Sequence, residues 1–390
     1  MTLTAPPLAL YVHFPWCVRK CPYCDFNSHT LNGELPEQAY IDALRADLRQ
    51  QLSFAQGRTL QSIFMGGGTP SLFAPAALAE LLEFVAQQLP LAADAEITME
   101  ANPGTIEHHR FSDYRAAGIN RVSLGGQSFG AAQLERLGRI HAADDTRRAA
   151  EELHRAGLTN FNIDLMYGLP GQDVAGAVDD MRSALALQPA HVSHYQLTLE
   201  PGTVFGGRPP PDLPDEELLL PMLEGAQTLL GAAGFGQYEV SAYARAGRQS
   251  RHNLNYWRFG DYLGIGAGAH GKYTDVTAGR IVRTTREREP RRYLASAASA
   301  PGSQIVDAAQ LPFEFMMNAL RLPEGFAMQL FEARTGLAAA AVEATLDPQR
   351  ARGLIEVTGG HFRPTLWGCA SSMSCCSNSC RGKNRDGIRT

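Results

Sequence analysis

Three cysteines near the amino end constrain this chain more than any other feature of its sequence. Cys17, Cys21 and Cys24 form a CxxxCxxC spacing directly after the apolar, strand-like segment Leu8–His13. Thiolates are the ligands that iron–sulfur clusters use, and three of them on one short loop can hold three irons of a [4Fe–4S] cube while the fourth iron stays open. The spacing therefore predicts a [4Fe–4S] cluster whose open iron can bind a small molecule.

A structural zinc loop is the alternative interpretation of the same cysteines. Zinc fingers usually pair a CxxC with a second ligand pair that closes a tetrahedron. Neither His13 nor His29 supplies such a pair at the usual spacing. We therefore favour the cluster over zinc.

Composition predicts a folded protein that handles small molecules. Of 390 residues, 44% are hydrophobic, which is enough for a large core, and the net charge of -5 gives no electrostatic reason to expect nucleic acid as the main partner. Met1–Pro7 contains no basic segment followed by an apolar one, and nowhere do about eighteen uncharged apolar residues run together. The seven cysteines fall into two clusters unlike a secreted disulfide framework. We expect a cytoplasmic protein without a membrane span.

Short apolar runs alternate with longer helical patterns along the first half of the chain. Strand–helix alternation predicts a parallel sheet, and six such units fit an open doubly wound sheet or a partial barrel equally well. The predicted strands are Leu8–His13, Ser62–Met65, Glu96–Met99, Arg121–Leu124, Phe161–Leu165 and His191–Leu197. The predicted helices are Pro36–Gln56, Pro75–Leu89, Asp144–Ala156, Asp173–Leu187 and, after a proline-rich loop, Glu216–Ala233.

A second, smaller domain is predicted at the carboxyl end. The segment Ala295–Gln304 is rich in Ala, Ser, Pro and Gly, which is typical of a linker, and Leu311–Val357 reads as a helical region.

The run from Tyr11 to His29, with its CxxxCxxC loop, resembles the signature of radical S-adenosylmethionine (SAM) proteins. It is most similar to the anaerobic coproporphyrinogen III oxidase family, and especially to its HemW branch of heme chaperones. The resemblance runs from about Leu8 to about Phe362 and implies a partial (βα)6 barrel with a smaller, mainly helical C-terminal domain. It also implies that SAM chelates the fourth iron and is cleaved to a 5′-deoxyadenosyl radical.

The resemblance divides the chain into four segments. It implies a radical SAM core at 1–240, a heme-motif segment and linker at 241–300, a small HemN-like domain at 301–367 and an aberrant tail at 368–390.

The same resemblance implies a SAM site at the carboxyl ends of the strands. Each residue also has a plainer interpretation: a glycine run can be a tight turn, a carboxylate can be solvated, and an aromatic ring can simply belong to the core. One departure from relatives is Gly125-Gly126-Gln127, where Gly-Val-Gln is more usual. The implied SAM-binding residues are Tyr11, Tyr23, Gly67, Gly68, Thr69, Glu100, Gln127, Arg139 and Asp164.

Phe26 distinguishes two branches of the family. The decarboxylating oxidases carry a fourth cysteine two places after the third, and this chain has Phe26 there. The resemblance therefore favours a heme chaperone, with heme, an unidentified acceptor protein and an electron donor as partners. Oxygen-independent oxidation of coproporphyrinogen III is the alternative function, and a SAM-binding protein without turnover is a third.

The segment Arg251–Trp257 resembles the HNxxYW element of HemW proteins. A neutral imidazole is a common axial ligand of heme iron, and Tyr256 and Trp257 could pack on a porphyrin face. His252 is thus the candidate heme-binding residue, although a lone histidine beside aromatic residues is more often a hydrogen-bonded core residue. His270 is a weaker candidate.

The composition changes abruptly after Trp367. From Cys369 onward the chain is rich in Ser, Cys and Arg and has no amphipathic period, whereas relatives end in an apolar helix. We interpret this tail as the product of a frameshift. The alternative is a second metal site formed by Cys369, Cys375, Cys376 and Cys380.

Overall fold

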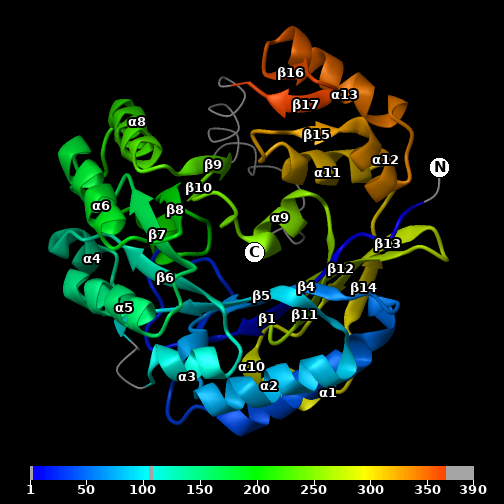
Figure 1. Ribbon diagram of the computed structural model, residues 1–390, viewed down its shortest axis with the longest axis horizontal. Helices are drawn as coiled ribbons and strands as arrows, with labels where there is room; N and C mark the ends of the chain where they lie inside the picture. The colour runs from blue at the N-terminus through cyan, green and yellow to red at the C-terminus, as the bar shows by residue number, and fades with distance from the viewer. Residues whose placement is uncertain (1–2, 105–108, 366–390) are drawn as a thin grey trace.

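A curved twelve-stranded sheet organises most of the chain (Figure 1). The computed structural model describes residues 3–104 and 109–365. The strand order is β14-β13-β12-β11-β1-β4-β5-β6-β7-β8-β10-β9. Within these residues no pairing joins β9 to β14, so the sheet forms an open barrel.

The six predicted parallel strands are all present and lie side by side in chain order. Most of their residues are buried, and polar side chains alternate with apolar ones along β6, β7 and β8. Their bounds are β1 (Leu8–Phe14), β4 (Leu60–Gly67), β5 (Leu91–Ala101), β6 (Arg121–Gln127), β7 (Phe161–Tyr167) and β8 (His191–Gln196).

Six further strands extend this sheet, and the sequence did not predict them. The strand β11 (Asp261–Ile265) pairs in parallel with β1, and antiparallel strands continue from it on one side and from β8 on the other. The antiparallel strands are β12 (His270–Asp275), β13 (Arg280–Thr285), β14 (Gly302–Ile305), β10 (Ala242–Ala244) and β9 (Gly236–Glu239). The segment Ala295–Gln304, expected to be a linker, thus contributes to an edge strand.

Helices cover the outer face of the sheet and bury the main core against it (Figure 1). The five predicted helices are present, with ends within one or two residues of those expected. They are α1 (Glu37–Ala55), α2 (Pro75–Gln88), α5 (Ala143–Arg155), α6 (Val174–Ala186) and α8 (Glu216–Ala232). Shorter elements are η1 (Pro70–Leu72), α3 (Phe111–Ala116), α4 (Ala131–Arg136), α7 (Val204–Gly207) and α10 (Pro290–Ser296).

One short helix lies on the opposite, concave side of the sheet. Helix α9 (Arg251–Trp257) packs against β4 and β1, inside the curve of the strands (Figure 1). Ser250 caps it by accepting a hydrogen bond from the backbone N–H of Asn253. The predicted heme motif therefore faces the interior of the barrel.

The C-terminal domain combines helices with a small sheet. Phe315 makes edge contacts with Phe326 and Phe331, and it also contacts Phe259 of the main domain at 5.7 Å between ring centroids. The predicted mainly helical domain is confirmed, and two of the three strands of its small sheet begin inside the region Leu311–Val357. The elements are α11 (Leu311–Ala319), β15 (Phe326–Ala327), α12 (Met328–Thr335), α13 (Ala340–Ala351), β16 (Ile355–Thr358) and β17 (His361–Pro364).

The predicted aberrant tail, 368–390, lies outside the described residues. Among the helices that are described, none has the length and apolar character needed to cross a bilayer.

Candidate functional site: a thiol cavity beside a larger chamber

The cysteine loop is held between two short paired strands. In β2 (Trp16–Cys17) and β3 (His29–Thr30), Trp16 pairs with His29 and Cys17 with Thr30. Within the loop, the Lys20 ammonium donates hydrogen bonds to the carbonyls of Phe26 and Ser28. These bonds close the loop around its three thiols.

The three thiols line one cavity of about 150 Å³, and none of them is in a disulfide. Burial raises the pKa of the Cys17 thiol to about 11, and burial likewise raises the pKa of Cys24. Metal binding would have to displace these protons, as it does at thiolate sites generally. The cavity thus offers three thiols on one wall.

The donor set fits an iron–sulfur cube. Within residues 3–104 and 109–365, no three His, Cys, Asp or Glu side chains gather closely enough to hold a single metal ion. In a [4Fe–4S] cube each thiolate binds a different iron, so the three sulfurs do not have to converge on one atom.

The glycine run after β4 is tied to the chain that leads into the cysteine loop. The backbone N–H groups of Gly68 and Thr69 donate hydrogen bonds to the carbonyls of Phe14 and Trp16, at 2.6 and 2.8 Å. Gly67 has a φ of +109°, and a Cβ there would overlap the ring of His13. Glycine is therefore required at Gly67 for both backbone and space.

Two carboxylates stand between the thiol cavity and the barrel interior. Glu100 Oε2 accepts a 3.0 Å hydrogen bond from the Gly67 N–H, yet burial, reinforced by the charge of Asp164, raises the pKa of Glu100 to about 7. Asp164 accepts hydrogen bonds from Asn162 and Ser123, and burial raises its pKa despite them. Both carboxyls can gain or lose a proton closer to neutrality than ordinary surface acids do.

Gln127 and Arg139 line the thiol cavity from the β6 side. Gln127 has a φ of +65° after a register shift in the Gly-Gly segment, and its Oε1 accepts a 2.8 Å hydrogen bond from the Tyr195 hydroxyl. Arg139 donates to the Gly125 carbonyl at 2.8 Å and lies 3.6 Å from the Cys21 sulfur. Its Nε is buried without a partner among the described residues. The Arg139 guanidinium thus keeps a donor available beside the thiols.

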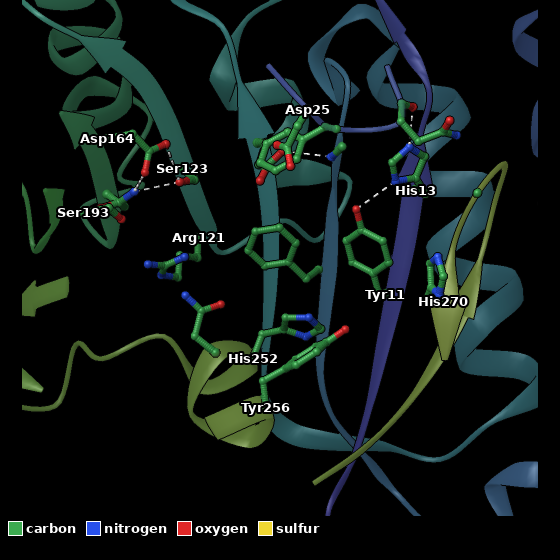
Figure 2. A pocket seen from close by; sticks show the side chains of 18 of the residues that line it. Tyr11, His13, Asp25, Arg121, Ser123, Asp164, Ser193, His252, Tyr256 and His270 are labelled. Carbon is green, nitrogen blue, oxygen red and sulfur yellow. Dashed lines mark hydrogen bonds between the residues drawn. The ribbon is translucent and has the colours of Figure 1, made fainter. Parts of the chain in front are cut away.

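Tyr23 and Tyr11 lie in different places. Tyr23 lines the thiol cavity and packs near Phe205. Tyr11 lines the larger chamber instead, where its hydroxyl is 2.9 Å from Nδ1 of His13 (Figure 2). Of the predicted SAM residues described here, Tyr11 is therefore the one that the structure separates from the thiols.

A chamber of about 640 Å³ fills the concave side of the sheet beside the thiol cavity. The two spaces are contiguous, because five residues line both of them. These shared residues are Phe26, Gly67, Glu100, Ser123 and Asp164. Phe26, at the position of the missing fourth cysteine, is thus part of the boundary.

Alternate residues of the central strands give the chamber a polar wall. Ser123 and Asp164 project inward together with the residues two positions before them (Figure 2). This wall was not predicted, because the strands were expected to be apolar runs. The signal for it is the polar residue at every second position. The paired inward positions are Arg121 and Ser123, Asn162 and Asp164, and His191 and Ser193.

Four histidines line the chamber, and two of them are fully engaged. His13 lies between the Tyr11 hydroxyl and the Asn27 carbonyl, both at 2.9 Å, and His191 lies between Asn162 and Tyr238. Burial lowers the pKa of His13 to about 4 and that of His191 well below its usual value. Both nitrogens of each of these rings are used by the protein.

The other two histidines keep a ring nitrogen available. His252 is 4% exposed, its Nδ1 lies 3.4 Å from the Ser62 hydroxyl, and its ring stacks on Phe64 at 4.9 Å. Within the described residues, Nε2 of His252 forms no hydrogen bond. The ring nitrogens of His270 form none either. Burial, and then the charge of Arg121, lowers the pKa of His252 to about 3, so this imidazole is neutral at physiological pH.

Comparisons with known proteins agree on one family. Residues 11–184 match the model of the radical SAM superfamily, and residues 306–369 match the HemN C-terminal domain. The chain is 57% identical to the heme chaperone HemW of Escherichia coli (strain K12) over 289 residues, 74% of this chain and 76% of that protein. It is 53% identical to HemW of Haemophilus influenzae over 293 residues, 74% of this chain and 76% of that protein.

The fold also resembles a solved structure. Coproporphyrinogen III oxidase (HemN) from Escherichia coli, described as a radical SAM enzyme, superposes with a TM-score of 0.78 over 96% of this chain and 91% of that one. The two sequences are 22% identical, so this likeness establishes the fold alone.

Proposed function

This chain belongs to the HemW family within the radical SAM superfamily, and on that premise we propose that it binds heme in its larger chamber and hands it to an acceptor protein. The observation that carries this proposal is the available imidazole of His252 in a chamber of about 640 Å³. That volume lies within the range of small-molecule and cofactor sites. A neutral imidazole nitrogen is a common ligand of heme iron.

Aromatic side chains around His252 support the same proposal. Phe64 stacks on the His252 ring, and Tyr256 lies 5.4 Å away between ring centroids (Figure 2). Flat aromatic surfaces would pack against a tetrapyrrole, whose burial is favoured by its large apolar area.

We further propose that Cys17, Cys21 and Cys24 hold a [4Fe–4S] cluster and that the surrounding residues bind SAM. When bound, these groups supply one-electron chemistry. Arg139 would hold the SAM carboxylate, because a guanidinium is the usual partner of carboxylates. The role of the remaining residues would be to position and enclose SAM: Tyr23, Gly67, Gly68, Thr69, Glu100, Gln127 and Asp164.

The proposal includes an electron donor and an acceptor protein, neither of which the chain identifies. A cytoplasmic location is part of the proposal, because a reducing compartment keeps thiols available as cluster ligands.

Titration of hemin into His252→Ala and wild-type protein tests heme binding. We expect the substitution to weaken hemin binding at least roughly tenfold and to remove the absorption bands of an imidazole-ligated iron. His361→Ala is the matched control, because His361 is exposed on β17 and far from the chamber wall. A His252→Ala protein with unchanged heme spectrum and affinity would falsify the assignment of His252, and His270→Ala would then be tested as the ligand.

Oxygen-independent coproporphyrinogen III oxidation is the second candidate, and one observation favours it. The larger chamber shares a wall with the thiol cavity, so a porphyrinogen there would border the site of radical chemistry. Mass spectrometry after anaerobic reconstitution with SAM, a reductant and coproporphyrinogen III separates the two functions. Deoxyadenosine with protoporphyrinogen indicates the oxidase. Deoxyadenosine without a decarboxylated porphyrin supports the chaperone.

A further inference from the structure

Arg121 places a buried guanidinium on the wall of the larger chamber (Figure 2). It begins β6 and is 2% exposed. Its ion pair with Glu96 is long, at 3.8 Å between Nε and Oε2, and Nε has no hydrogen-bond partner. Within residues 3–104 and 109–365, the guanidinium of Arg121 forms no hydrogen bond at all. A buried guanidinium whose donors form no hydrogen bond is costly, even with an acid 3.8 Å away, which makes this arrangement unusual.

A second arginine of the same chamber shows what a structural guanidinium looks like. Arg286 donates hydrogen bonds to the carbonyls of Ser299 and Ala297, both at 2.8 Å, and its Nε lies 3.1 Å from Asp47. Its side chain is therefore held by protein groups on several sides. Arg121 differs because its donors face the chamber.

Glu96 compensates part of the charge of Arg121 across the 3.8 Å ion pair but accepts no hydrogen bond from it. Its Oε1 accepts hydrogen bonds from the backbone N–H groups of Arg251 and His252, at 3.0 and 3.3 Å, and so caps the first turn of α9. The charge of Arg121 also lowers the pKa values of His191 and His252, which shows that its field acts across this end of the chamber. Of the other acids of the chamber wall, Asp164 also feels the charge of Arg121, and both Glu100 and Asp164 stand at the boundary with the thiol cavity.

We propose that Arg121 anchors a carboxylate of the ligand in the larger chamber, with Nη1 and Nη2 as donors. This inference rests on the proposed function, under which the ligand is heme and the carboxylate is one of its propionates. A guanidinium and a carboxylate form two parallel charge-assisted hydrogen bonds. The anchor fixes the orientation of the heme. One propionate then points toward β6 and α9, and the two propionates do not both remain at the solvent-exposed side of the chamber.

The rival anchor is Arg288, an exposed arginine that also lines the chamber. If both propionates stayed near solvent, Arg288 would contact them and Arg121 would not. The two arginines therefore make opposite predictions for the same ligand.

Hemin and its dimethyl ester, in which both carboxylates are masked, test the proposal as matched probes. Wild-type protein should bind the ester roughly ten- to one-hundredfold more weakly than hemin, the worth of a charge-assisted hydrogen bond. Arg121→Met should weaken hemin binding by a similar factor while leaving ester binding unchanged, so that the ratio of the two Kd values approaches one. Arg288→Met should keep the wild-type ratio.

Thermal unfolding of the ligand-free variants separates a binding role from a structural one. Arg121→Met should keep a Tm close to that of wild type, because Arg121 makes no hydrogen bond to the protein, its ion pair with Glu96 is long, and Glu96 keeps two backbone N–H donors. Arg121→Gln is a second variant that retains a polar group if the methionine variant folds poorly. The proposal is overturned if both Arg121 variants keep the wild-type ratio of the ester Kd to the hemin Kd. It is also overturned if that ratio approaches one only in Arg288→Met. Failure of wild-type protein to bind either porphyrin overturns the proposed function as well.

Discussion

The backbone N–H of Gly67 donates a 3.0 Å hydrogen bond to Oε2 of Glu100, and this bond joins the glycine run of β4 to a carboxyl that borders both cavities. One hydrogen bond does not offset the burial of this carboxyl. Burial and the charge of Asp164 raise the pKa of Glu100 to about 7. The protonation of Glu100 therefore changes near neutral pH.

Glu100→Gln should make the ligand-free protein less sensitive to a rise in pH from about 4.5 to 7. The folded pKa of Glu100 lies above the usual value of 4.5, so the folded state holds its proton more tightly and loses stability as pH rises from about 4.5 to 7. Glutamine keeps an oxygen for the Gly67 N–H but carries no charge. Urea denaturation should show the variant gaining up to about 3 kcal/mol over wild type by pH 8, and less where water in the cavity solvates the carboxylate.

The matched control for Glu100 is Glu37→Gln. Glu37 also accepts a hydrogen bond from a backbone N–H, that of Ala74, but lies outside both cavities. An equal gain in both variants, or none in Glu100→Gln, would contradict the assigned burial effect.

Gly67→Ala should destabilise the protein far more than Gly57→Ala. Both glycines have positive φ, +109° and +73°, but a Cβ at Gly57 meets no atom within 4 Å, whereas one at Gly67 overlaps the His13 ring. Strain alone should cost about 1–2 kcal/mol at Gly57, and the overlap should bring the cost at Gly67 to about 3 kcal/mol or more. Chemical denaturation of both variants measures the difference, and equal losses would show that the Gly67 loop can relax.

The parts of the fold that could be predicted are those with local sequence signals. Each of the six parallel strands is a buried run followed by a helical period, and both patterns are visible in one stretch of chain. The strand β11 could not be predicted because its five residues gain their partner, β1, from the opposite end of the main domain. The exposed edge strand β14, Gly302–Ile305, has the composition of a linker and is ordered by pairing with β13.

The same limit applies to the candidate site. Glu100 and Gln127 follow strands and match a family pattern, so both could be predicted, and both line the thiol cavity. The chamber could not be foreseen, because it depends on which face of each strand turns inward and on α9 lying inside the barrel. Arg121 was read only as the start of a strand, although a charged residue at an inward position is the signal of a polar interior.

Arg139→Met should weaken SAM binding in the reconstituted protein roughly tenfold or more, because it removes the buried guanidinium beside the thiols. Arg136→Met is the control, since Arg136 is exposed and its nearest acid, Asp212, is 3.6 Å away on the surface. Equilibrium dialysis with labelled SAM provides the measurement. If the two variants bind SAM equally well, Arg139 is not a SAM-binding residue.

Serine at any of Cys17, Cys21 or Cys24 should abolish cluster assembly, because a cube held by three thiolates has no spare ligand. Iron and sulfide analysis after anaerobic reconstitution should give about four irons for wild type and few for each variant. Replacing the four tail cysteines together by serine tests the second metal site. Iron content at the wild-type level in that variant argues against it, and a loss of iron would support it.

His194→Phe should make the protein less sensitive to acid. His194 is 3% exposed, its Nδ1 has no partner among the described residues, and burial lowers its pKa to about 4. Its folded pKa lies below the usual 6.5, so the unfolded state binds the proton first and stability falls as pH drops from about 6.5 to 4.

This effect opposes that of Glu100, whose window overlaps it, so the contributions of these two groups partly cancel in the wild-type protein. Urea denaturation of Glu100→Gln should therefore expose a steeper loss below pH 6.5, and adding His194→Phe to it should remove up to about 3 kcal/mol of that loss at pH 4. An unchanged slope in the double variant would show that the pKa of His194 is the same in the folded and unfolded states.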